Sequence, residues 1–202
     1  MRFAVLGVLA LLVPTVALTR AADLHPASAL KSAALKPAPE FVVQLTNGQQ
    51  VLLSSLRGKV IALEFLYTTC PHCQHASQVF TQLAKEYGPR GFEPVGVAFN
   101  PMSQMLVNDF VRDFKVGYTV GYSERDRVLD FLAISPLERF VVPQIVWIDR
   151  KGMIRSQTPA NGDNTEMYQE PYWRHMIETL TAEHAGAAHK PASHRVVHTA
   201  RR

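Results

Sequence analysis

The feature that most constrains the fold of this chain is a pair of cysteines at the junction between two unlike segments. Residues 60–67, which precede the pair, form a nearly continuous apolar run, and such a run is typical of a central β-strand covered on both faces. Residues 71–87, which follow, carry apolar side chains at helical spacing. The motif Cys70-Pro71-His72-Cys73 is therefore expected where a buried strand passes into a helix.

This position predicts redox chemistry. The unpaired N–H groups and the positive dipole end of a helix N-terminus stabilise a thiolate at Cys70, so Cys70 is the candidate nucleophile. Cys73 lies one turn away and is the candidate resolving thiol. Pro71 suits the first helical turn, where no N–H is needed. His72 adds a donor beside the thiolate, which favours the reduced form and makes the disulfide a stronger oxidant. Pro71 and His72 are the candidate redox-tuning residues.

Two other interpretations of the cysteine pair stay open at this point. It could be a static structural disulfide, or it could bind a metal ion together with His72 or His75, as in a copper-chaperone-like module. The chain has only these two cysteines, which are too few for a four-thiolate zinc site or an iron–sulfur cluster. His75 itself is expected to be exposed rather than catalytic.

The rest of the chain alternates short strands with helices. Residues 41–45 and 50–53 flank Asn47-Gly48 and predict an N-terminal β-hairpin. The sequence therefore predicts an α/β fold with a mixed central sheet. Further strands are expected at 95–99, 118–120, 144–149 and 153–158, and further helices at 102–114, 125–132 and 165–183. The inward residues of the 102–114 helix are expected to be Met105, Leu106, Phe110 and Phe114.

The two ends of the chain differ from its middle. Residues 1–22 have a positive start, a short apolar run and small residues after it, which predicts a secretory signal peptide cleaved after Ala17 or Ala22. An uncleaved membrane anchor and a buried helix are the alternatives. Residues 23–39 are predicted to be a linker and residues 40–183 the folded domain. Export would place the cysteines where disulfides persist.

Charge gives no support for a nucleic-acid partner. The formal net charge is +4, but residues 184–202 alone contribute four basic residues and no acid. Residues 23–183 hold 15 basic and 17 acidic residues, so the folded part is slightly acidic. The tail 184–202 is expected to be disordered and solvated, and its four histidines fit no known metal-ligand spacing.

From residue 41 to about residue 180 the sequence resembles the thioredoxin superfamily, in particular the exported TlpA-type thiol–disulfide oxidoreductases and redoxins. Three segments carry the resemblance: the Gly-Lys and apolar strand of residues 58–65, the motif of residues 70–73, and residues 142–152. The peroxiredoxin pattern is missing, because Tyr67 stands where those proteins have threonine, three residues before the reactive cysteine. No peroxidase activity is expected.

The resemblance implies roles for four further residues. Pro143 is expected to be cis and to lie opposite Cys70, and Val142 to bind a substrate polypeptide through its backbone, as an added strand. Tyr67 replaces the aromatic residue that usually precedes the motif, and it is the third candidate for substrate binding. Glu64 is expected to be a buried proton relay for the resolving cysteine. The alternatives are an ordinary trans proline and a surface Glu64 paired with Lys59.

These observations predict an extracytoplasmic thioredoxin-like enzyme, periplasmic or secreted, that exchanges disulfides with protein substrates. The dithiol carries the electrons, so no cofactor and no metal are expected. The expected partners are protein thiols or disulfides and a membrane or periplasmic redox protein. The direction of exchange is open: His72 favours disulfide formation, whereas the TlpA-like body favours reduction, as in cytochrome c maturation.

Overall fold

Strand β4 (Val60–Leu66) lies inside the sheet and is buried along its whole length. It pairs in parallel with β5 (Phe92–Ala98) and antiparallel with β7 (Gln144–Ile148). The continuous apolar run of the sequence therefore forms a central strand, as predicted, because both faces of β4 are covered by protein.

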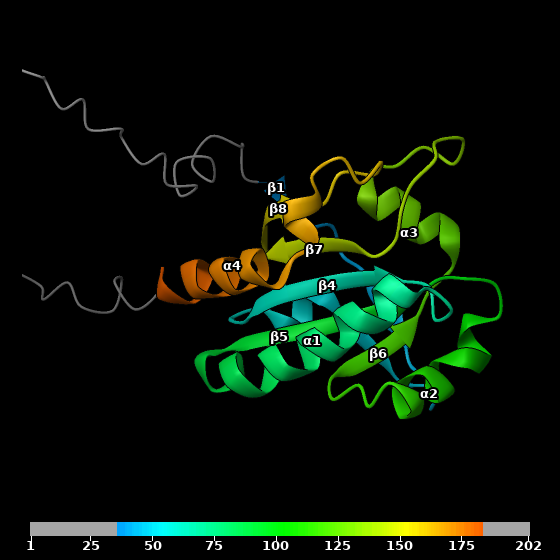
Figure 1. The fold of residues 1–202 in the computed structure, drawn as a ribbon, viewed down its shortest axis with the longest axis horizontal. Helices are drawn as coiled ribbons and strands as arrows, with labels where there is room; N and C mark the ends of the chain where they lie inside the picture. The colour runs from blue at the N-terminus through cyan, green and yellow to red at the C-terminus, as the bar shows by residue number, and fades with distance from the viewer. Residues whose placement is uncertain (1–35, 184–202) are drawn as a thin grey trace, which may run out of the picture. The chain divides into compact units, whose positions relative to one another are not determined.

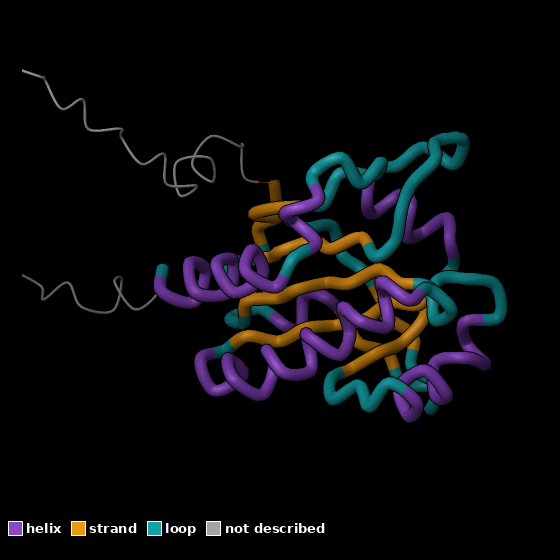
Figure 2. Tube along the Cα trace, viewed as in Figure 1, coloured by secondary structure: helices purple, strands orange, loops and turns teal. Residues whose placement is uncertain are grey.

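The structure is a computed structural model that describes residues 36–183 (Figures 1 and 2). The predicted signal peptide, the tail 184–202 and most of the predicted linker lie outside this range. Within it, eight strands form one mixed sheet in the order β1-β8-β7-β4-β5-β6-β2-β3. The remaining strands are β1 (Lys36–Pro37), β2 (Val42–Gln44), β3 (Gln50–Leu52), β6 (Thr119–Tyr122) and β8 (Met153–Gln157), and the helices are α1 (Pro71–Tyr87), α2 (Ser103–Asp113), α3 (Arg125–Leu132) and α4 (Glu170–Ala182). Short 3-10 helices are η2 (Leu53–Leu56), η3 (Gly88–Arg90) and η4 (Thr165–Tyr168).

The two faces of β4 contact different parts of the core. Ile61, Leu63 and Phe65 pack in a cluster with residues of the N-terminal hairpin region and of α3, including an edge-to-face pair between Phe65 and Phe41 at 5.4 Å. The intervening residues face α1, which packs on β5 and α4 and crosses the sheet in Figure 1. This alternation places Glu64 under α1.

Most elements lie where the sequence predicts them. The helix predicted at 125–132 is α3, and the predicted hairpin is β2–β3, with Gly48 in the turn at φ 83°. Such a positive φ is freely accessible to glycine, which explains the Asn-Gly turn signal. The fold is thioredoxin-like, with its redox motif at the N-terminus of α1.

Three details differ from the sequence-based expectations. The helix expected at 165–183 is split into η4 and α4, because Pro171 lies in the first turn of α4 and cannot continue a preceding helix. Residues 36–37, inside the predicted linker, form β1 against β8. Met105 was expected to face inward and is 69% exposed; the buried positions of α2 are Ser103, Val107 and Phe110, which follow the helical period from a different start.

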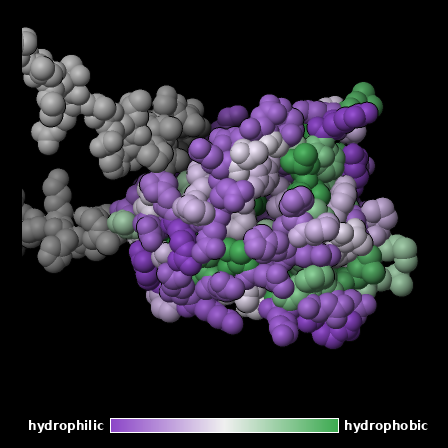
Figure 3. All heavy atoms as spheres, viewed as in Figure 1, coloured by the Kyte–Doolittle hydropathy of each residue, from purple (hydrophilic) through white to green (hydrophobic). Residues whose placement is uncertain are grey.

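The exposed surface is largely hydrophilic on the face drawn in Figure 3, with hydrophobic residues gathered mainly towards its right-hand side. Among the described residues the large exposed hydrophobic side chains are Leu52, Met102, Met105, Leu137 and Val141. None of the helices between residues 36 and 183 combines the length and the apolar character that crossing a bilayer requires.

Candidate active site

The redox motif begins at the N-terminus of α1. Cys70 is the N-cap residue, with extended backbone at φ −87°, and Pro71 follows in the first turn. The loop from β4 is held in place by hydrogen bonds: the Cys70 N–H donates to the carbonyl of Tyr67 at 3.1 Å, and the Thr68 N–H donates to Asn100 Oδ1 at 2.9 Å. The helix therefore presents its unpaired N–H groups at the cysteine pair.

The two thiols are free and differ in their surroundings. Cys70 is half-buried, whereas Cys73 is fully buried. Burial raises the pKa of the Cys73 thiol, and the negative charge of Glu64 raises it further. Cys70 is thus the thiol that an outside molecule can reach, and Cys73 needs a base before it can react.

Glu64 lies beneath the motif and is fully buried. Its Oε2 accepts hydrogen bonds from Tyr118 Oη at 2.6 Å and from Ser77 Oγ at 3.0 Å. Burial raises the pKa of this carboxyl from 4.5 to about 7, although the two hydrogen bonds act in the opposite direction. Lys59, the alternative partner considered for Glu64, instead pairs with Glu93. A carboxyl with this pKa can both accept and release a proton near neutrality.

The segment before β7 lies opposite the motif. The Val142–Pro143 peptide bond is cis, as the resemblance implies, and Cys70 Sγ lies 3.7 Å from the carbonyl oxygen of Val142. Val142 is half-buried and Pro143 is buried. The neighbouring Val141 N–H donates to Ala160 at 2.8 Å, which ties the segment to the loop after β8.

Tyr67 supports the loop from below. It is half-buried, and its ring packs edge-on against Phe99 with 4.7 Å between the ring centroids. Phe99 in turn stacks on Phe140, which lies in the segment leading to Val142. Tyr67 therefore connects the motif loop to the segment opposite it. A direct role of Tyr67 in substrate binding stays a prediction.

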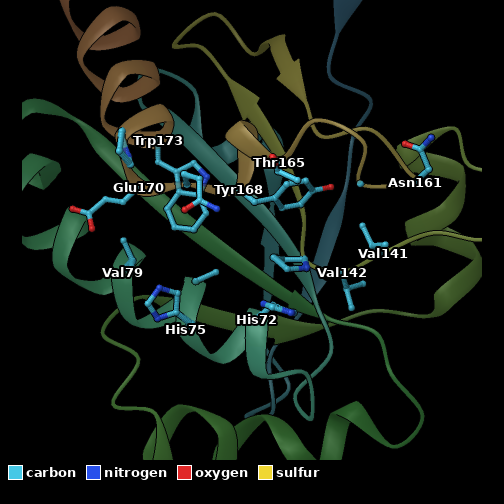
Figure 4. Close-up of a pocket in the computed structure, with 15 residues that line it drawn as sticks. His72, His75, Val79, Val141, Val142, Asn161, Thr165, Tyr168, Glu170 and Trp173 are labelled. Carbon is cyan, nitrogen blue, oxygen red and sulfur yellow. The ribbon is translucent and has the colours of Figure 1, made fainter.

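A groove of about 560 Å³ lies beside the motif, between α1 and the segment that contains η4 and the start of α4 (Figure 4). His72 and His75 line its α1 side, and both are exposed, as expected for His75. Val142 and Pro143 line it next to the motif, and Tyr168 belongs to the opposite wall. Cys70 is not among the lining residues, but its neighbours His72 and Val142 are, so the groove runs past the redox motif.

Sequence reasoning missed the two partners of Glu64. Ser77 lies four residues after Cys73, so helical periodicity places it on the same face of α1 as the resolving thiol. Tyr118 lies 54 residues away from Glu64 in the chain, and no local pattern connects the two. No group of three or more potential metal ligands among His, Cys, Asp and Glu is found in the part of the chain that the structure describes.

The thioredoxin-like fold and the dithiol at the N-terminus of α1 define a thiol–disulfide oxidoreductase. The chain belongs to the AhpC/TSA family, whose model matches residues 34–157.

Curated relatives carry the same class of activity in their names. The thiol-disulfide oxidoreductase ResA of Bacillus subtilis is 33% identical over 100 residues, which is 50% of this chain and 55% of that protein. ResA of Bacillus cereus is 25% identical over 137 residues, covering 68% of this chain and 75% of that protein.

Solved structures share the fold. A putative thiol:disulfide interchange protein DsbE from Chlorobium tepidum matches with a TM-score of 0.60 at 20% identity, covering 74% of this chain and 98% of that one. A putative protein disulfide isomerase from Bacteroides thetaiotaomicron matches with a TM-score of 0.57 at 26% identity, covering 77% of this chain and 94% of that one. At 20% identity the first likeness concerns the fold alone.

Proposed function

We propose that this protein exchanges disulfides with polypeptide substrates outside the cytoplasm, through the dithiol of Cys70 and Cys73. The observation that carries the proposal is the pairing of a reachable and an unreachable thiol. Cys70 is half-buried at the helix N-terminus, 3.7 Å from the Val142 carbonyl, while Cys73 is fully buried behind it. A substrate sulfur can then reach Cys70 and not Cys73, and Cys73 is the thiol of this chain that can release the substrate from Cys70.

In the reducing direction the exchange has two steps. The Cys70 thiolate attacks one sulfur of a substrate disulfide, a Cys70–substrate disulfide forms, and the other substrate sulfur leaves as a thiolate that takes a proton from water. Cys73 then attacks Cys70 Sγ, the Cys70–Cys73 disulfide forms, and the second substrate sulfur leaves. The protein loses two electrons and the substrate disulfide gains them. The oxidising direction is the reverse.

Glu64 serves the second step as a proton relay. The Cys73 thiol has a raised pKa and does not ionise at neutral pH by itself. The pKa of Glu64, at about 7, leaves a large fraction of this carboxyl ionised and able to take the Cys73 proton. Since the carboxyl is shielded from bulk water, the proton is transferred inside the protein.

The substrate lies along the cis-proline segment. The Val142 carbonyl is beside Cys70, and an extended polypeptide that pairs with this backbone brings its own sulfur next to the nucleophile. The groove next to Pro143 receives side chains that flank the substrate cysteine. Tyr67 positions the motif loop through its packing on Phe99.

The direction of exchange depends on the reduction potential of the pair. His72 is exposed in the first turn of α1, where a donor or positive charge stabilises the Cys70 thiolate and raises the potential. We expect a value above the roughly −270 mV of thioredoxin, which suits disulfide formation. A value near or below it would instead assign the protein to the reduction of disulfides, such as those formed by the cysteines of apocytochromes in cytochrome c maturation.

Turnover of a polypeptide substrate tests the function. We expect the reduced full-length protein to reduce the disulfides of insulin catalytically when a dithiol reductant regenerates it. The rival function is a metal-binding module that uses Cys70, Cys73 and a histidine. Titration of the reduced protein with Cu(I) and Zn(II) separates the two: submicromolar binding together with no turnover would favour the rival.

The extracytoplasmic location rests on residues 1–22, whose positive start and apolar run are typical of an exported protein. Fractionation of cells that express the full chain tests it. We expect the protein in the periplasmic, secreted or membrane fraction, with its cysteines oxidised or cycling. Recovery in the cytoplasmic fraction, with residues 1–22 still attached, would contradict export.

A further inference from the structure

Tyr118 reaches the active site from a distant part of the chain. It lies immediately before β6, on the connection from α2, and its hydroxyl donates to Glu64 Oε2 at 2.6 Å. Its pKa is raised well above the ordinary value, first by burial and then by the negative charge of Glu64, so the phenol keeps its proton at neutral pH and acts as a donor.

The backbone next to Tyr118 is hydrogen-bonded to α1. The Gly117 N–H donates to Thr81 Oγ1 at 3.0 Å, and Thr81 Oγ1 donates to the carbonyl of Ser77 at 2.8 Å. A Cβ at residue 117 would lie 2.9 Å from Thr81 Cγ2, so a larger residue at this position would have to displace the Thr81 side chain. The connection is thus held against the helix that carries both cysteines, at the residue next to Tyr118.

The two carboxyl oxygens of Glu64 differ in their hydrogen bonds. Oε2 accepts from both Tyr118 and Ser77, whereas Oε1 is buried and has no hydrogen-bond partner among the described residues. A buried polar atom without a partner costs free energy, and native proteins contain few of them. Cys73 lies one helical turn before Ser77 on the same face of α1, so its thiol is on the side of the helix that faces Glu64. The negative charge of Glu64 raises the pKa of that thiol, and the remaining oxygen of the carboxyl has no other donor in the described part of the chain.

We propose that Tyr118 is a positioning residue for the resolving step: with Ser77 it holds one oxygen of Glu64 and leaves the other free to take the proton of Cys73. The inference rests on the relay role of Glu64 in the proposed function and extends it to the α2–β6 connection. The proton moves from Cys73 Sγ to Glu64, the Cys73 thiolate then attacks Cys70 Sγ, and the substrate sulfur leaves. Tyr118 keeps its own proton throughout.

The inference predicts a specific change in pH dependence. The hydrogen bond from Tyr118 stabilises the ionised carboxyl and lowers the pKa of Glu64 from where burial alone would place it. In a Tyr118→Phe protein the carboxyl keeps its proton to higher pH. We expect the pH midpoint of the resolving step to rise by about one unit, with a roughly five-fold slower step at pH 7 and little change well above both midpoints.

The test uses the reduced full-length protein and dithiobis(nitrobenzoate) as the probe. Attack by Cys70 releases one thionitrobenzoate, and attack by Cys73 on the resulting mixed disulfide releases the second, so the second phase reports the resolving step. We expect Tyr118→Phe to shift the pH profile of the second phase and not that of the first. Ser77→Ala should shift it in the same direction, because it removes the other donor to Oε2.

Tyr87→Phe is the matched control. Tyr87 also donates a hydrogen bond to a carboxylate, the exposed Glu178 at 2.8 Å, but at the other end of α1 from the cysteines, so its profile should match the wild type. If the pH profile of Tyr118→Phe keeps its midpoint, or if the rate of its second phase is lowered equally at every pH, the inference about Tyr118 is overturned. The relay role of Glu64 in the proposed function would still stand. If Glu64→Gln resolves as fast as the wild type, the relay of the proposed function fails as well.

Discussion

We expect replacement of Cys70 by serine to abolish exchange, with the rate of insulin reduction falling to that of the uncatalysed reaction. A serine hydroxyl cannot form a disulfide, and Cys73, which is 0% exposed, cannot take over the attack on an external sulfur. The expected loss is complete because the first bond to the substrate is never made. Turnover assays and the first phase of the dithiobis(nitrobenzoate) reaction measure it.

Cys73→Ser provides the matched control. This protein keeps the half-buried nucleophile Cys70, so it should complete the first phase and then stop as a mixed disulfide between Cys70 and the substrate. Mass spectrometry of the stalled species would identify bound polypeptides. Residual turnover in Cys70→Ser, or a mixed disulfide on Cys73 in that variant, would contradict the assignment of nucleophile and resolving thiol.

Glu64→Gln is expected to change stability in a pH-dependent way. The pKa of Glu64 is about 7 in the folded protein against an ordinary value of 4.5, so the folded protein keeps a proton that the unfolded chain releases. The contribution of this group to stability is fully present below pH 4.5, is lost as the pH rises towards 7, and stays lost above it. At about 1.4 kcal/mol per pH unit the loss is about 3 kcal/mol.

Glutamine has no proton to release, so the variant should escape this loss. Relative to the wild type, its free energy of unfolding should rise by about 3 kcal/mol between pH 4.5 and pH values above 7. Urea unfolding at pH 4.5, 6 and 8 measures the difference. Glu93→Gln, which removes a partly exposed carboxylate from β5, is the control and should show no comparable trend. A constant difference between Glu64→Gln and the wild type would mean that Glu64 is not neutral near pH 6.

The same substitution should slow the resolving step by about 10²-fold or more, because an amide can accept hydrogen bonds from Tyr118 and Ser77 but cannot take a proton. The first step, at Cys70, should be unaffected. Between pH 4.5 and neutral pH the variant thus gains stability relative to the wild type, and it is less active. This combination is common where a buried group is kept for chemistry rather than for folding.

Local patterns were sufficient to predict most of the fold. The apolar run of β4, the helical spacing of α1 and the Asn-Gly turn each depend on residues close together in the chain, so their structures follow from short-range periodicity and turn chemistry. The cis bond before Pro143 came from the resemblance to a family, and no local pattern predicts it. Met105 shows the limit of periodicity, since a helix of eleven residues can start its buried stripe at more than one position.

The features of the active site can likewise be separated into those that local sequence predicts and those that depend on tertiary contacts. By itself the sequence determined that a dithiol would lie at a strand-to-helix junction, with an acid on the strand before it, because these residues are neighbours along one continuous segment. Only the tertiary structure decided which thiol is reachable, which oxygen of Glu64 is held, and that Tyr118 holds it. These features depend on contacts between α1, β4 and the α2–β6 connection, which the packing of separate elements brings together and which leave no pattern in the local sequence.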